Sequence, residues 1–356
     1  MSENKSDIGK RNLSLDCLRI MAMVMVVLIH ITSHGLKEAE IIPYSAVAWM
    51  AQFVNTFSLV AVNCFVLISS YFLSGGTPHF KKLIPLWIQV WTYSVGVYAV
   101  LCFIPGSGVD FSIKQLIRCG LPLLSQQYWF FTFYFLMYLL APTMNRLINV
   151  LDRKDYERLL ALLLIVFSVI PSINIFGDSF KVNSGYSLTW FLVLYLIAGY
   201  LRKWTPQKNN FWGWGYILPC LILSVLRVLM PVIEGKISIL STLILNQTAY
   251  NAPFMVIAST SLFVWALGHK ISFSDRVNRF VVKISVLAFG VYLLHDHGVF
   301  SGVLWKSVVR LGEVVQQPIV FIGRGVLTLI LIFVVGISVE WTRNAIMRLF
   351  LKNKLY

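Results

Sequence analysis

Charged residues are scarce in this sequence, and their scarcity excludes a soluble globular protein. Only 13% of the 356 residues are Asp, Glu, Lys or Arg, whereas 58% are hydrophobic and 14% are aromatic. The mean hydropathy is +0.75. A soluble domain cannot cover that much apolar surface with polar side chains. The composition therefore predicts a polytopic membrane protein, with one integral-membrane domain over residues 1–356 and no soluble domain.

Several sequence signals are also missing. The five cysteines are scattered, mostly in apolar runs, and none forms a CxxC pair; we interpret them as small packing residues and not as a disulfide framework or a metal site. The sequence has no GxSxG elbow, no P-loop and no GxGxxG. It has no internal repeat of 20–50 residues and no low-complexity tract. These absences argue against the cofactor-dependent chemistry of soluble enzymes.

Long apolar segments are what the sequence has in abundance. A helix that spans a bilayer needs roughly 20 apolar residues, and about ten segments approach that length. We therefore predict an all-α bundle of about ten transmembrane helices. The segment 46–73 is long enough to be tilted or to include an interfacial part, and the pair 158–175 and 187–201 is the weakest. The other predicted spans are 15–35, 83–104, 128–149, 211–230, 249–267, 284–300 and 318–340.

The positive charges predict the orientation of these helices. The formal net charge is +15, and most Lys and Arg residues fall in the loops that a ten-span topology with an internal N-terminus places in the cytoplasm. We therefore predict a cytoplasmic N-terminal tail over 1–13 and a cytoplasmic C-terminal tail over 342–356. The first apolar run has no small-residue cleavage site, so we interpret it as a retained span and not as a signal peptide.

The first span carries ionisable residues where lipid-facing residues are expected. Arg19 and His30 are eleven residues apart, about three helical turns, so they share one face roughly 16 Å apart along the axis. Asp16 precedes Arg19 by three positions and can pair with it. Such groups are costly at membrane depth unless they face protein or water. The pair could be a simple interfacial ion pair, and His30 could be a structural histidine. Histidine also suits proton abstraction or proton relay, which leaves both catalysis and proton transport open.

Six segments, in chain order, carry a resemblance to one known family: LDCLRIMAMVMVVLIH, NCFVLISSYFLSG, FKKLIPLW, YWFFTFYFLMYLLAPTMN, SLTWFLVLYLIAGYLRK and FGVYLLHDHG. In the first segment an Arg is followed eleven positions later by a His. These segments resemble the membrane acyltransferase 3 family, and the Arg and His resemble its first span. The closest resemblance is to the exopolysaccharide-cluster O-acetyltransferases of Gram-positive bacteria.

The resemblance implies an enzyme of the bacterial cytoplasmic membrane. It would move an acyl group, acetyl by default, from cytoplasmic acyl-CoA to a hydroxyl of a surface polysaccharide or its lipid-linked precursor. His30 would be the catalytic histidine, as general base or acyl relay, and Arg19, next to Asp16, would hold the CoA end or shape the tunnel. No bound cofactor, metal or nucleic acid is expected. The chain ends soon after its last span, so no extracytoplasmic esterase-like domain is expected either.

The sequence departs from the family pattern in two places. Lys81 and Lys82 stand where arginines are common in the family, and Ser69-Ser70 replaces a Ser-Gly pair. A lysine still meets phosphate as a point charge but lacks the bidentate fork of arginine. Lys81 and Lys82 therefore predict a binding site for the CoA phosphates, although the positive-inside rule alone explains two loop lysines.

Two further regions are candidates for binding the acceptor. Trp129, at the start of a span, could form a wall of the acceptor pocket or belong to an interfacial aromatic belt. His295 and Asp296 in HDH predict a polar acceptor site, with a hydrated helix end as the alternative; His-x-His alone lacks the three or four ligands of a zinc site. The competing function for the whole chain is a proton-coupled transporter or flippase of a sugar or small solute, with His30 as relay.

Overall fold

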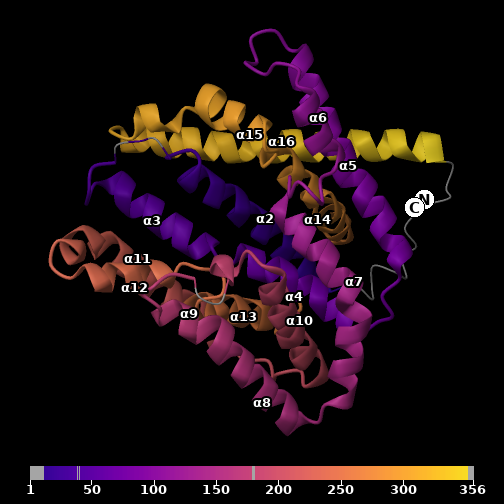
Figure 1. Cartoon of the computed structure of the whole chain (residues 1–356), viewed down its shortest axis with the longest axis vertical. Helices are drawn as coiled ribbons and strands as arrows, with labels where there is room; N and C mark the ends of the chain where they lie inside the picture. Colours follow the sequence, from indigo (N-terminus) through magenta and orange to yellow (C-terminus); the bar gives the residue numbers. More distant parts are fainter. Residues whose placement is uncertain (1–11, 38, 40, 179–180, 352–356) are drawn as a thin grey trace.

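The computed structural model describes residues 12–37, 39, 41–178 and 181–351, and these residues form helices and turns without a β-strand. The longer helices pack side by side into one bundle (Figure 1). The α-helices are α2 (Leu13–Ser33), α3 (Ala46–Ser58), α4 (Ala61–Ser74), α5 (Leu83–Phe103), α6 (Ile113–Gly120), α7 (Trp129–Val150), α8 (Arg153–Leu164), α9 (Ile170–Ile173), α10 (Leu188–Lys203), α11 (Phe211–Glu234), α12 (Ser238–Asn246), α13 (Pro253–Gly268), α14 (Asp275–His295), α15 (Phe300–Val303) and α16 (Pro318–Leu351).

Shorter helical pieces continue or connect these helices. A π-helical stretch, η2 (Ile165–Val169), joins α8 to α9, and a second one, η4 (Leu304–Val309), follows α15. Single 3₁₀ turns occur at η1 (Phe80–Lys82), η3 (Asn183–Gly185) and η5 (Leu311–Val314). The residue between η4 and η5, Arg310, has a left-handed backbone with φ of 47°, so the chain reverses sharply there.

Helix α2 is the central element of the bundle. The side chain of Asn12 accepts hydrogen bonds from the backbone N–H groups of Ser14 and Leu15, which caps the N-terminus of the helix. From there α2 packs against α3, α4, α13, α14 and α16, and Figure 1 shows it between α3 and α14. Residues on several of its faces are therefore buried, among them Leu18, Ala22 and Val27. An all-round apolar helix is expected at such a position.

Each predicted span overlaps at least one helix, and the prediction of a polytopic all-α bundle is confirmed. Within the described part of the chain, seven helical segments are long and apolar enough to cross a membrane: Leu13–Ser33, Ala46–Ser74, Phe80–Phe103, Arg153–Ile173, Phe211–Glu234, Asp275–His295 and Pro318–Leu349. The remaining three predicted spans correspond to α7, α10 and the shorter apolar helix α13. The total number of spans and the side on which the termini lie remain predictions.

Several boundaries differ from the predicted ones. Helix α14 covers Asp275–His295 in place of 284–300, because its first turns carry charged residues that a hydropathy criterion rejects. The segment 46–73 is divided between α3 and α4. The predicted tail 342–356 is helical as far as Leu351, with Arg343 paired to Glu340 at 2.7 Å. Residues 1–11 and 352–356 of the predicted tails lie outside the described residues.

A buried asparagine ties three helices together beside the site described below. Asn63 of α4 is fully buried. Its amide nitrogen donates to the Tyr250 carbonyl at 2.7 Å and to the Ser259 hydroxyl at 3.2 Å, and its amide oxygen accepts from the Trp190 indole at 3.1 Å. A buried polar group is tolerated when its hydrogen bonds are made within the protein. Asn63 therefore fixes the loop around Tyr250 against α4 and α10.

Candidate active site

A cavity of about 600 Å³ lies inside the bundle. Apolar side chains of α2, α4 and α14 line part of it, including Val26, Phe65 and Phe289, while His30 and Asp296 contribute polar groups. The side chain of His30 is 14% exposed. The ionisable side of the first span therefore faces an internal cavity, as the cost of burying polar groups in lipid requires.

His30 is held by a second histidine from the far end of the chain. The Nδ1 atom of His30 lies 2.8 Å from the Nε2 atom of His295. The Nδ1 atom of His295 lies 2.6 Å from the carbonyl oxygen of Val291. Since a carbonyl can only accept, His295 donates from Nδ1, and with both rings neutral its Nε2 accepts the Nδ1–H of His30. The lone pair of His30 is then on Nε2.

Asp296 lies beside that lone pair. The Nε2 atom of His30 is 3.8 Å from the Oδ1 atom of Asp296, the residue that follows the last turn of α14. Burial raises the pKa of the Asp296 carboxyl group above its ordinary value. A positive charge on His30 would stabilise the ionised carboxylate, so the two groups favour an imidazolium–carboxylate pair once His30 has taken up a proton.

Aromatic side chains form one wall of the same cavity. The ring centroid of Trp129 lies 4.3 Å from that of Tyr186 and 6.1 Å from that of Tyr250, the latter pair stacked at 15°. All three residues line the cavity. Trp129 starts α7, whereas Tyr186 and Tyr250 come from loops. The structure therefore places Trp129, a sequence candidate, within the cavity that contains His30, and adds two tyrosines that sequence reasoning missed.

The HDH segment separates into three different environments. His295 is buried behind His30, and Asp296 lines the cavity. His297 is also buried, and its Nε2 donates to the carbonyl of Ser94 at 3.0 Å. Both ring nitrogens of His295 are engaged with protein groups, and a role of His295 in binding the acceptor stays a prediction. His297 joins the end of α14 to α5.

Asp16 and Arg19 form the expected pair, at the other end of α2. The Nη1 atom of Arg19 lies 2.7 Å from the Oδ1 atom of Asp16, which also accepts from the hydroxyl of Ser285 at 2.8 Å. Arg19 lines a separate cavity of about 230 Å³, which we call the Arg19 cavity. Its other lining residues are Asn12, Leu15, Asp16 and Phe72. The two cavities share no lining residue, although Arg19 and Met23 are only one turn apart. The cavity at Arg19 and the cavity at His30 are therefore separate in this conformation.

Lys81 and Lys82 lie on the surface of the bundle. They form the η1 turn, after the segment that follows α4. That segment is fixed by α7: Tyr138 donates to the carbonyl of His79 at 3.2 Å, and Asn145 donates to that of Gly76 at 3.1 Å. The two lysines are exposed and line neither the His30 cavity nor the Arg19 cavity.

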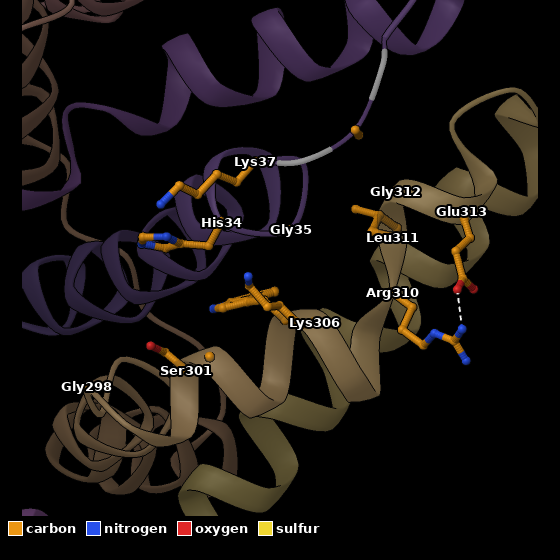
Figure 2. A pocket seen from close by; sticks show the side chains of 13 residues that line it. His34, Gly35, Lys37, Gly298, Ser301, Lys306, Arg310, Leu311, Gly312 and Glu313 are labelled. Carbon is orange, nitrogen blue, oxygen red and sulfur yellow. Dashed lines mark ion pairs between the residues drawn. The ribbon is translucent and has the colours of Figure 1, made fainter. Parts of the chain in front are cut away.

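Another cavity, of about 430 Å³, opens next to the cavity that His30 lines. His34, Gly298 and Ser301 line both. Figure 2 shows His34 and Lys37 on one side of the gap and Ser301 and Lys306 on the other, with Arg310 paired to Glu313 at one edge. We call this opening the vestibule. Sequence reasoning missed His34, although its position four residues after His30 places both on one helical face.

One comparison with known proteins gives a match over most of the chain. The family model Acyl_transf_3, described as "Acyltransferase domain", matches residues 12–339, which is nearly the whole chain. No curated protein and no solved structure matches the chain. The matched range begins at the cap of α2 and ends within α16, so it includes His30, Trp129, His295 and Asp296.

Proposed function

The chain belongs to the membrane acyltransferase 3 family, and on that premise we propose that it moves an acyl group, acetyl in the simplest case, from cytoplasmic acyl-CoA to a hydroxyl of a cell-surface polysaccharide or its lipid-linked precursor. It is a multi-pass membrane acyltransferase. The donor, the acceptor and the bacterial cytoplasmic membrane as its location are parts of the proposal. One observation carries the proposal. The hydrogen bonds from His30 to His295 and from His295 to Val291 leave the lone pair of His30 on its Nε2 atom, and His30 lines the cavity.

In the proposed mechanism His30 acts as the general base. Its Nε2 atom takes the proton of the acceptor hydroxyl as the oxygen attacks the carbonyl carbon of the thioester. The new C–O bond forms, the C–S bond breaks, and CoA leaves as a thiolate that receives the proton from the imidazolium. Asp296, 3.8 Å from Nε2, stabilises that imidazolium while it exists. His295 keeps the ring in the orientation and tautomer that this step needs.

The donor would approach from the N-terminal end of α2. Lys81 and Lys82 are exposed on the surface of the bundle, and cations at a surface attract the phosphates of CoA. The Arg19 cavity offers a cation closer to the bundle interior. Because the Arg19 and His30 cavities are separate, the proposal requires a movement around Arg19 and Met23 that lets the thioester reach His30.

The acceptor would enter from the opposite end, through the vestibule. Trp129, Tyr186 and Tyr250 line the cavity and pack on one another, so they form an aromatic wall. Aromatic faces pack against the apolar faces of sugar rings while hydroxyl groups remain free to form hydrogen bonds. A sugar on this wall would lie in the same cavity as the Nε2 atom of His30.

The test is acyl transfer by membranes that contain the full-length chain. Membranes are incubated with radiolabelled acetyl-CoA, and label is measured in butanol-soluble glycolipid and in polymer. We expect His30→Ala to lower the transfer rate by about 10²–10⁴-fold, the range typical of a lost general base. His79→Ala, which removes an exposed histidine, is the matched control and should retain the wild-type rate. Unchanged transfer by His30→Ala at equal expression would contradict the proposal.

A further inference from the structure

We propose that His30, His34 and Asp296 form a binding site for a divalent transition-metal ion, with Zn²⁺ as the ion that fits best, and that an ion bound there blocks acyl transfer. Each of the three residues offers one ligand atom, and these atoms lie within 4.8 Å of one another. The inhibition rests on the proposed function of His30, whereas binding of the ion does not.

The ligand types and their spacing suit zinc. Two imidazoles and one carboxylate are frequent ligands of Zn²⁺, at about 2.0–2.2 Å from the ion. His30 lies on α2, and His34, four residues later, caps the C-terminus of that helix with helical backbone angles. This is the spacing with which two histidines of one helix bind zinc, and the two ring centroids are 5.0 Å apart. Two ligand atoms of a tetrahedral zinc ion lie about 3.4 Å apart, so the widest pair of the set must close by up to about 1.4 Å. His34 is exposed and can turn to do so.

A second observation points to the same ligand role for His30. A metal-binding histidine almost always donates its other N–H to a protein acceptor, which fixes the tautomer and aims the lone pair. His30 meets that condition, because its Nδ1 lies 2.8 Å from Nε2 of His295, itself held by the carbonyl of Val291. The remaining nitrogen, Nε2, is 3.8 Å from Oδ1 of Asp296. The hydrogen bonds that prepare a base also prepare a metal ligand.

The site has a route of entry. His34 lines both the vestibule and the His30 cavity, and Figure 2 shows its ring at the gap opposite Lys306. An ion can therefore reach the three ligands without passing through the packed helices around Met23. Three protein ligands leave one coordination position of a tetrahedral ion for water.

Occupation of this site would switch off the proposed chemistry. The ion binds the lone pair of His30 Nε2, the same electron pair that takes the proton of the acceptor hydroxyl. It also neutralises Asp296, which otherwise stabilises the imidazolium. Metal binding and proton uptake at His30 therefore exclude each other.

The binding test uses the purified full-length chain in detergent, and it needs no acyl transfer. The protein is incubated with Zn²⁺, desalted and analysed for zinc content, and a parallel titration with Co²⁺ follows the visible absorbance of the bound ion. We expect one ion per chain in the wild type and in His79→Ala, and loss of that ion in His34→Ala. Asp296→Asn is the second variant, in case His34→Ala fails to remain monodisperse. Equal zinc content in wild type, His34→Ala and Asp296→Asn would overturn the site.

The inhibition test measures transfer from acetyl-CoA at rising Zn²⁺, with each variant normalised to its own rate without the ion. We expect the half-inhibiting concentration to rise at least about tenfold in His34→Ala, and a chelator to restore the wild-type rate. Loss of wild-type activity on chelation would overturn the inference, because the ion would then be required and not inhibitory. If no acceptor is labelled by the wild type, the proposed function fails while the binding test still decides the site.

Discussion

The Nδ1 atom of His30 lies 2.8 Å from the Nε2 atom of His295, although 265 positions separate the two residues in the chain. This contact joins the C-terminal end of α2 to that of α14, and it determines which nitrogen of His30 faces the cavity. In the mechanism proposed above, His295 therefore acts through His30. Four predictions follow from this and from the other parts of the site.

Replacement of His295 should impair catalysis through the orientation of His30. His295→Ala leaves the Nδ1–H of His30 without its acceptor, so we expect kcat to fall about 100-fold with a small change in the KM of acetyl-CoA. His295→Gln provides a carbonyl oxygen that can accept the same hydrogen bond, so it should recover part of the loss. Steady-state kinetics on both variants check this. A fall of the same size in both would indicate that His295 serves packing alone.

Truncation of Trp129 should weaken binding of the acceptor. Trp129→Ala removes the ring that packs on Tyr186 and Tyr250, and we expect the acceptor KM to rise about tenfold while the KM of acetyl-CoA stays constant. Trp214→Ala, which removes an exposed tryptophan of α11, is the matched control. An equal rise in the KM of both substrates would argue against an acceptor wall.

Loss of the two lysines of η1 should weaken binding of the donor in a salt-dependent way. In the double variant Lys81→Gln/Lys82→Gln we expect the KM of acetyl-CoA to rise about fivefold at low ionic strength and less at high ionic strength. A thioester without phosphate groups, acetylated pantetheine, should be used equally well by the double variant and the wild type. Lys236→Gln, a change to an exposed lysine after α11, should have no effect. If the KM of acetyl-CoA changed equally at low and high ionic strength, the two lysines would serve only the orientation of the helices in the membrane.

The carboxylate of Asp16 should contribute to stability. It is buried and accepts hydrogen bonds from Arg19 and Ser285, so Asp16→Asn should lower the free energy of unfolding by about 1–3 kcal/mol. The midpoint of thermal unfolding in detergent measures this. Asp155→Asn alters an exposed pair with Arg158 and should leave the midpoint unchanged, as is usual for surface pairs. An unchanged midpoint in Asp16→Asn would show that the carboxylate of Asp16 does not contribute to stability.

The sequence by itself determined the class of fold and the histidine at its centre. The apolar composition requires a membrane environment, and helices are the segments that satisfy their own backbone in lipid. The spacing of Asp16, Arg19 and His30 placed them on one helical face, and Asp16 does pair with Arg19. The sequence determined the helix boundaries less closely than the class of fold. Charged first turns conceal the start of α14, and a break within one apolar run separates α3 from α4.

Only the tertiary structure decided what surrounds His30. Helical periodicity relates residues a few positions apart, and it carries no information on which distant segment packs against which. The approach of α14 to α2 made His295, a candidate for binding the acceptor, the partner of His30, and two loops placed Tyr186 and Tyr250 beside Trp129. The separation of the Arg19 and His30 cavities is likewise a property of side-chain packing between helices, which depends on shapes that meet only after the chain has folded.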